Sequence, residues 1–256
     1  MKLLGFVDEF QQDWQLAGRA VTTGADYARC LRELAAATGD TPSLRDVKLW
    51  LGARPTATAR RRAQAVRAFG KWSAENDGPD FSWWSRVPLA NVPVTAQPTV
   101  SKQDYERATR LPLSRRDLLV VELLWCAGLR VSELARLQRA DVALTGRFVI
   151  VKQSKTNQPR LAPLSDRACR LIRRYDSGTA SLLGLGKTGV QQMLKRHDLP
   201  PAHAWRRGWA VRSLREGVSE TSVRAAAGWK SGAMVARYTA AASAELAIHE
   251  FRSKLG

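Results

Sequence analysis

The chain has 256 residues, of which 45% are hydrophobic, so it can form one large domain or two domains of ordinary size with real cores. Its formal net charge of +18 favours a polyanionic partner, nucleic acid above all, over the alternative of a merely solvated basic surface. The sequence shows neither a signal-peptide pattern nor an apolar run of membrane-spanning length, which favours a soluble, cytoplasmic protein. Its three cysteines are scattered, so we expect small buried residues rather than a disulfide framework at Cys30, Cys126 and Cys169.

The first part of the chain is predicted to be helical, because its apolar residues recur at helical spacing. In the fourth helix the apolar side chains form one stripe, and basic side chains share the opposite face. Such a helix suits a DNA backbone, although a solvated helix face would look the same. The predicted helices cover residues 6–17, 25–38, 43–51 and 56–76, and the basic residues of the fourth are Arg60, Arg61, Arg67 and Lys71.

Three prolines at five-residue intervals, Pro88, Pro93 and Pro98, cannot lie inside a helix and indicate an extended linker. We therefore expect a helical domain at 1–86, a linker at 87–98 and a second domain at 99–256. Residues 1–95 carry 13 basic and 10 acidic residues, whereas residues 96–256 carry 28 and 13. Most of the attraction for a polyanion is thus expected in the second domain.

The second domain is predicted to be mainly helical with one small antiparallel sheet. Alternation of β-branched and polar residues around a polar turn predicts a hairpin, and the remaining segments have helical periodicity. The expected fold class is therefore mainly α, with an α+β second domain. The predicted helices are 101–111, 114–128, a helix starting at 131–137, and several after residue 165; the hairpin is 147–164.

Several catalytic patterns are absent from the sequence. It contains no H-E-x-x-H, no D-x-D and no P-loop, and its three histidines are not at ligand spacing. A metal-dependent nuclease and a nucleotide hydrolase are therefore not supported. We expect neither a metal nor a cofactor.

A set of basic and aromatic residues remains, and each member has an ordinary interpretation when it is taken singly. Arg130 can pair with Glu133, a turn lysine such as Lys155 needs no function, and Tyr238 can belong to a core. Their order along the chain is more specific, R-(x24)-K-(x47)-H-x-x-R-(x22)-W-(x8)-Y. Together with "CAGLRVSELARL", "HAWRRGWAV" and "AGWKSGAMVARYT", it resembles the tyrosine recombinase (phage integrase) family over residues 100–245.

The resemblance implies a catalytic role for each residue of the set. It makes Tyr238 the nucleophile that forms a 3′-phosphotyrosine, with Glu133 as a supporting residue. It also implies that neither ATP nor metal is needed. Residues 1–86 resemble the core-site DNA-binding domain of the family in size and type only. Arg207 and Arg237 are further DNA-binding candidates; Arg237 adjoins Tyr238, and a solvated side chain is its alternative interpretation. The catalytic residues implied are Arg130, Lys155, His203, Arg206, Trp229 and Tyr238.

The last segment, 244–256, places apolar residues on one helical face. In this family such a helix docks on a neighbouring protomer, which implies a tetramer on double-stranded DNA; packing on its own domain is the alternative. The apolar residues are Ala244, Ile248, Phe251 and Leu255.

The sequence departs from the family pattern at three places. Trp229 stands where most relatives have histidine, and Arg207 and Gly208 stand where histidine and a small hydroxyl residue are more usual. We expect no arm-site domain of the kind found in larger phage integrases before residue 1, and therefore no accessory-site binding by this chain.

The resemblance leaves the biological role open. A phage or mobile-element integrase, possible accessory factors included, is our first hypothesis, and a chromosome- or plasmid-dimer resolvase of the same family is the second. A DNA-binding protein without catalysis and a type IB topoisomerase are the alternatives from other classes.

Overall fold

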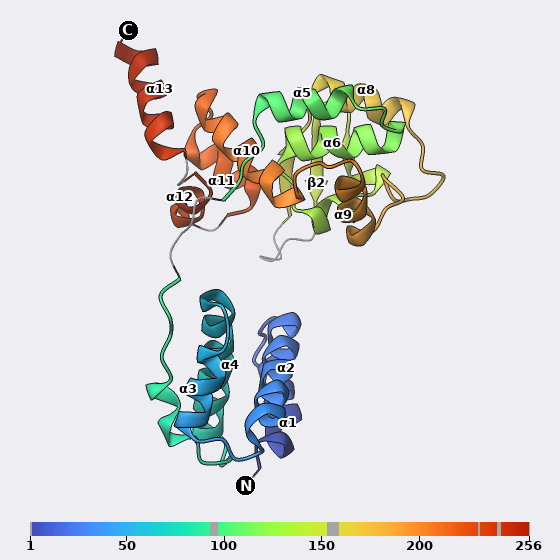
Figure 1. The fold of residues 1–256 in the computed structure, drawn as a ribbon. Coiled ribbons are helices and arrows are strands. Elements are labelled where there is room, and N and C mark those ends of the chain that lie inside the picture. Colours follow the sequence, from blue (N-terminus) through green and yellow to red (C-terminus); the bar gives the residue numbers. More distant parts are fainter. Residues whose placement is uncertain (1, 93–96, 153–158, 230, 240–241, 256) are drawn as a thin grey trace. The chain divides into compact units, whose positions relative to one another are not determined.

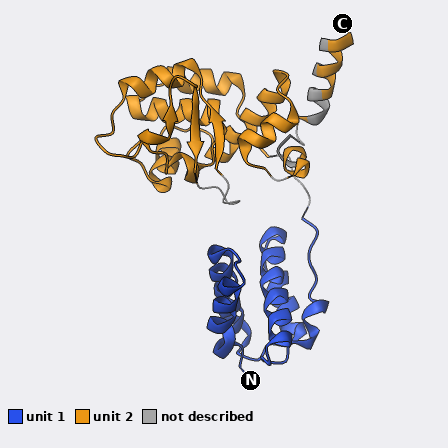
Figure 2. Ribbon diagram, turned by 180° about the vertical axis from the view of Figure 1, so that it is seen from behind, with its two compact units in different colours: residues 1–94 blue, residues 95–256 orange. Residues whose placement is uncertain are grey.

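The computed structural model describes residues 2–92, 97–152, 159–229, 231–239 and 242–255 (Figure 1). At 237–239, 243–246, 249 and 253 it describes the backbone alone. The chain divides into two compact units, Met1–Val94 and Thr95–Gly256 (Figure 2), and their boundary falls within the segment expected to be a linker. None of the described helices is long and apolar enough to cross a membrane.

The first unit is a small helical domain with an aromatic core. Phe10, Phe69 and Trp72 pack edge to face or tilted around one another, and Leu31 and Trp50 complete the centre. α2 begins four residues earlier than the apolar spacing indicated. The elements are the 3₁₀ turn η1 (Leu3–Phe6), α1 (Val7–Leu16), α2 (Val21–Thr38), α3 (Leu44–Gly52), α4 (Thr56–Glu75) and the 3₁₀ turn η2 (Ser82–Arg86).

The second unit surrounds a central helix, α6 (Arg115–Ala127), which contacts α5, α7, α8, α10 and β3. Leu119, Leu123 and Leu124 of α6 are fully buried, as expected for a helix that is apolar on most sides. The sequence order of the other elements is α5 (Lys102–Arg110), α7 (Val131–Leu134), η3 (Arg139–Asp141), β1 (Val142–Ala143), β2 (Phe148–Val151), β3 (Arg160–Pro163), α8 (Asp166–Arg174), α9 (Lys187–Arg196), α10 (Ala202–Arg215), α11 (Glu220–Ala227), α12 (Gly232–Thr239) and α13 (Ser243–Leu255).

The expected hairpin is part of a three-stranded antiparallel sheet with the order β1-β2-β3. Val149 lies opposite Val142 on one side and opposite Ala162 on the other. Along β3 the side chains alternate, with Arg160 and Ala162 inward and Leu161 outward. The sheet therefore directs an arginine towards the interior of the unit.

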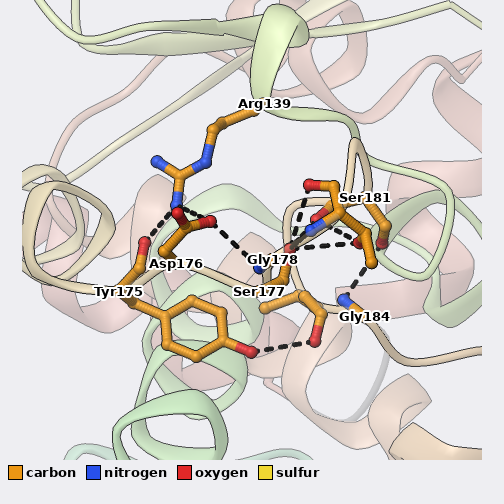
Figure 3. Close-up of polar contacts among 9 residues, drawn as sticks. Arg139, Tyr175, Asp176, Ser177, Gly178, Ser181 and Gly184 are labelled. Carbon is orange, nitrogen blue, oxygen red and sulfur yellow. Dashed lines mark hydrogen bonds and ion pairs between the residues drawn. The ribbon is translucent and has the colours of Figure 1, made fainter.

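The connection from α8 to α9 is held by polar contacts that Figure 3 shows in detail. Arg139 donates to the carbonyl of Tyr175, and its Nη2 lies 3.2 Å from Oδ1 of Asp176. The N–H of Leu182 donates to the carbonyl of Leu137 at 2.7 Å. These contacts hold the connection against the segment that follows α7, and α9 itself packs against α7.

Candidate active site

Arg130 lies in a tight turn between α6 and α7. Gly128 ends α6 in the left-handed conformation (φ 57°), and a Cβ there would lie 2.4 Å from the ring of Trp209, so glycine is required. The N–H of Arg130 donates to Oε2 of Glu133 at 2.7 Å, and its Nη1 donates to Oε1 at 2.6 Å. Glu133 thus holds both the backbone and the side chain of Arg130.

Arg206 lies on α10 and is fully buried. Its Nη1 donates to the carbonyl of Gly128 and lies 3.7 Å from Oε2 of Glu133, and its Nη2 donates to the carbonyl of Ala227 at 2.6 Å. The guanidinium joins the ends of α6 and α11 beneath the turn that carries Arg130. A phosphate can therefore reach Arg206 only after the atoms that cover it rearrange.

Trp229 follows α11, which ends at Gly228 in the left-handed conformation (φ 65°). The guanidinium carbon of Arg206 lies 5.2 Å from the centre of the Trp229 ring, within cation–π distance. The Trp229 side chain is buried, and the backbone N–H of Trp229 donates to the carbonyl of Arg224 at 3.0 Å in the capping turn of α11. The aromatic residue of the last box therefore lies beside the arginine of the preceding box.

His203 lies one turn before Arg206 on α10, with its side chain exposed. Partial removal from water lowers the pKa of His203, and the positive charges of Arg207, Arg206, Arg130 and Lys187 lower it further. The neutral imidazole is thereby favoured, which is the form that accepts a proton.

Two residues of the catalytic set, Lys155 and Tyr238, and the DNA-binding candidate Arg237 lie wholly or partly outside the described structure. Lys155 is not described, and for Arg237 and Tyr238 on α12 the backbone alone is described. The other lysine before the hairpin turn, Lys152, lies 2.5 Å from Oδ1 of the buried Asp141.

Arg160 is a site residue that none of the sequence motifs indicated. Its Nη2 donates to Oε2 of Glu133 at 2.6 Å, and its Nη1 donates to the carbonyl of Ala226. Burial lowers the pKa of Arg160, an effect that the charge of Glu133 opposes. The alternation along β3 could have indicated this role, because an arginine at an inward position must bind a carboxylate or carbonyls.

Three guanidiniums, of Arg130, Arg160 and Arg206, thus surround the single carboxylate of Glu133. The exposed fractions of these side chains are 20%, 7% and 0% respectively, so Arg130 is the member that faces solvent. With two positive charges in excess, this cluster favours an anion at its exposed end.

Gly208 departs from the family pattern for a steric reason. A Cβ at Gly208 would lie 2.2 Å from the carbonyl oxygen of Val100, so a hydroxyl side chain does not fit. The neighbouring Arg207 donates from Nε to the carbonyl of Pro98 at 2.8 Å. Both departures in the "HAWRRGWAV" box therefore face the segment that enters the second unit.

The basic candidates on α4 differ in exposure. Arg60 donates to the carbonyl of Ala90 at 2.7 Å, and Arg67 lies 3.4 Å from that of Val87. The other two candidates are exposed and form ion pairs, Arg61 with Asp26 and Lys71 with Glu75. The expected basic face is thus partly covered by the segment that follows η2.

Three kinds of comparison relate this chain to known proteins. The model of the phage integrase family matches residues 100–245. Tyrosine recombinase XerC of Mycobacterium tuberculosis is 31% identical, with 95% of this chain and 97% of the relative covered. Tyrosine recombinase XerA of Thermococcus kodakarensis is 24% identical, with 97% and 95% covered.

Solved structures share the fold of this chain. A lambda integrase (75–356) dimer bound to a COC′ core site superposes with a TM-score of 0.76 at 18% identity, covering 93% of this chain and 95% of that one. The Tn1549 transposon integrase in complex with transposon right end DNA gives 0.76 at 16% identity, with both chains fully covered.

Proposed function

We propose that this chain, which belongs to the phage integrase family, is a site-specific recombinase that breaks and rejoins DNA through a 3′-phosphotyrosine at Tyr238. The observation that carries the proposal is the cluster of Arg130 and Arg206 around Glu133, with Trp229 beside Arg206. It brings three sequence boxes of the family together in space, and its excess positive charge suits a phosphodiester.

Cleavage requires a negative charge to be stabilised and two protons to be moved. Tyr238 Oη attacks the phosphorus, and the bond from phosphorus to the 5′ oxygen breaks. Making the phenolate of a tyrosine with a pKa near 10 costs about 4 kcal/mol at pH 7, and nearby cations lower this cost. In this proposal His203 accepts the tyrosine proton, and Lys155 gives a proton to the leaving 5′ oxygen.

The arginines act on the charge that develops on the non-bridging oxygens. Arg130 is presented by Glu133 at the solvent-facing end of the cluster, where a fixed guanidinium fork can bind phosphate. Arg206 and Trp229 lie behind it, and in this proposal they complete the cradle once the atoms that cover Arg206 rearrange. Because the phosphotyrosine preserves the energy of the broken bond, rejoining needs neither ATP nor metal in this scheme.

DNA and further protomers are the proposed partners. The net charge of +18 and the exposed Arg61 and Lys71 support binding of a duplex backbone, with Arg60, Arg67, Arg207 and Arg237 as further candidates. On α13 the apolar side chains of Ile248, Phe251 and Leu255 are 53%, 63% and 80% exposed, which supports docking on another protomer. We propose a tetramer on DNA in the bacterial cytoplasm.

The relatives favour a second candidate role. The match to proteins named XerC and XerA extends over nearly the whole chain, which supports resolution of chromosome or plasmid dimers beside integration of a phage or mobile element. Recombination between two identical, directly repeated sites on a plasmid would support resolution. A requirement for two different sites, with or without accessory factors, would support integration.

The test of the function is covalent trapping. Nicked DNA with candidate sites is incubated with wild type and with Tyr238→Phe in EDTA, and adducts are resolved on a denaturing gel. An adduct formed by wild type and absent with Tyr238→Phe supports recombinase chemistry. Tight DNA binding without an adduct supports a DNA-binding protein, and relaxation of supercoiled DNA without recombination supports a topoisomerase.

A further inference from the structure

Arg160 lies where three parts of the proposed site meet. It begins β3, and the inward side chain is 7% exposed. One arm of its guanidinium reaches Glu133, which holds Arg130, and the other reaches the end of α11, from which Trp229 follows. The side chain of Arg206 likewise reaches both of these parts.

The end of α11 shows why the second arm matters. The last four carbonyls of a helix lack partners within the helix, and a helix end carries partial negative charge. Here the first two of them accept N–H groups of Gly228 and Trp229, at 3.1 and 3.0 Å. The last two accept from arginines, Ala226 from Arg160 and Ala227 from Arg206.

Gly228 lets Arg160 approach the helix end. A Cβ at position 228 would lie 2.7 Å from Cδ and 2.8 Å from Nε of Arg160, so the arginine stem passes against the glycine. The turn that positions the Trp229 backbone therefore packs against the Arg160 side chain.

The first arm acts on Arg130. Oε2 of Glu133 accepts from both the Arg130 N–H and Arg160 Nη2, while Oε1 accepts from Arg130 Nη1. A carboxylate fixed by two partners on one oxygen keeps the other oxygen in a fixed direction. Arg160 therefore determines where the guanidinium of Arg130 is held.

We infer that Arg160 is a positioning residue of the proposed active site, which sets the place of Arg130 through Glu133 and that of Trp229 through the end of α11. The inference rests on the proposed recombinase function. Arg160 itself is buried and need not touch DNA; it acts by keeping the partly exposed Arg130 aligned with the scissile phosphate.

The test compares Arg160→Met, which keeps most of the stem, and Arg160→Lys, which keeps the charge but has no planar fork. The matched control is Arg212→Met, because Arg212 is a partly buried arginine of the same unit that donates to the carbonyl of Trp125 at 2.8 Å, away from Glu133. Single-turnover cleavage, DNA affinity and urea unfolding are measured for each variant, with a phosphodiester or a neutral methylphosphonate at the cleavage site.

We expect Arg160→Met to slow phosphodiester cleavage on the order of 10- to 100-fold with unchanged DNA affinity, because misplaced groups cost rate rather than binding. Arg160→Lys should recover part of the rate. On the methylphosphonate the deficit should shrink, because one charged oxygen is missing and Arg130 has less charge to stabilise. Arg212→Met should cleave both substrates as wild type does.

Wild-type rates for Arg160→Met, or an equal deficit on both substrates and in Arg212→Met, would overturn the positioning role. If the Met variant does not fold, the ratio of the cleavage rates of Arg160→Lys on the two substrates decides in the same way. Failure of wild type to form any adduct would instead overturn the proposed function, so the two failures are distinguishable.

Discussion

Glu133 binds Arg130 twice, by its backbone N–H at 2.7 Å and by its guanidinium at 2.6 Å. The first contact closes the turn after Gly128, and the second fixes the direction of the side chain. One buried carboxylate thus couples the local fold of the chain to the position of a proposed catalytic group.

Replacing Glu133 by glutamine should affect both stability and cleavage. The substitution keeps the shape but leaves three guanidiniums without their counter-charge, and breaking a buried ion pair costs about 3–5 kcal/mol. We expect a loss of this order in urea unfolding, together with loss of adduct at temperatures where the variant is folded. A variant as stable and active as wild type would show that the carboxylate is dispensable.

Gly128→Ala should destabilise the second unit by more than the cost of placing an alanine in the left-handed conformation. A left-handed alanine costs about 1–2 kcal/mol, and the new Cβ would overlap the Trp209 ring, which adds about 1–3 kcal/mol. The control is Gly178→Ala, where φ is 70° but no atom lies within 4 Å of the new Cβ. Urea unfolding should show the larger loss for Gly128→Ala, and equal losses would contradict the close approach.

Cleavage that uses neutral His203 as a proton acceptor should persist at acid pH. Because the pKa of His203 is lowered in the folded protein, its neutral form persists below the ordinary value of about 6.5. The acid limb of kcat/KM for cleavage should therefore lie below pH 6.5 in wild type and be absent in His203→Gln. A limb at or above pH 6.5 that depends on His203 would contradict this expectation.

The same shift has a consequence for stability. The unfolded chain binds a proton at His203 more readily than the folded chain does. The contribution of His203 to the free energy of unfolding is therefore present above about pH 6.5 and is lost as the pH falls through the pKa of the folded state. Comparing the unfolding of wild type and His203→Gln between neutral and acid pH should show that part of the acid destabilisation is absent from the variant. An identical pH dependence of unfolding in wild type and His203→Gln would contradict this contribution of His203.

DNA binding should weaken steeply with salt. Phosphate contacts by arginine and lysine release counterions, and a protein with several such contacts loses about 10³–10⁵ in affinity between 50 and 200 mM salt. Titrations of a duplex over this range should give a steep linear decrease of log K with log salt. A nearly flat dependence would contradict binding through the excess positive charge of the chain.

The elements that rest on local patterns could be predicted from the sequence. The central α6, the glycine that ends it and the β2–β3 pairing follow from apolar spacing, a helix-ending residue and alternation. β1 was missed because two residues are too few for a period to appear. α7 is shorter than the expected 131–137, because Leu137 pairs with the distant Leu182 instead.

The site could be predicted only as far as the family boxes reach. Arg160 was missed because its partner Glu133 is 27 residues away and belongs to another element. On α4, helical spacing placed Arg60 and Arg67 on an open face, but the segment after η2 supplies carbonyls to both. Such tertiary contacts leave no periodic signal in the sequence.

The most direct measurement of the central claim is the identification of the residue that carries DNA. Wild-type protein is trapped on nicked DNA in EDTA, nucleases and a protease reduce the adduct to peptides, and mass spectrometry locates the nucleotide. The account predicts a 3′-phosphonucleotide on the peptide containing Tyr238, and on no other tyrosine. Attachment at Tyr27, Tyr105 or Tyr175, or at a residue of another type, would contradict it.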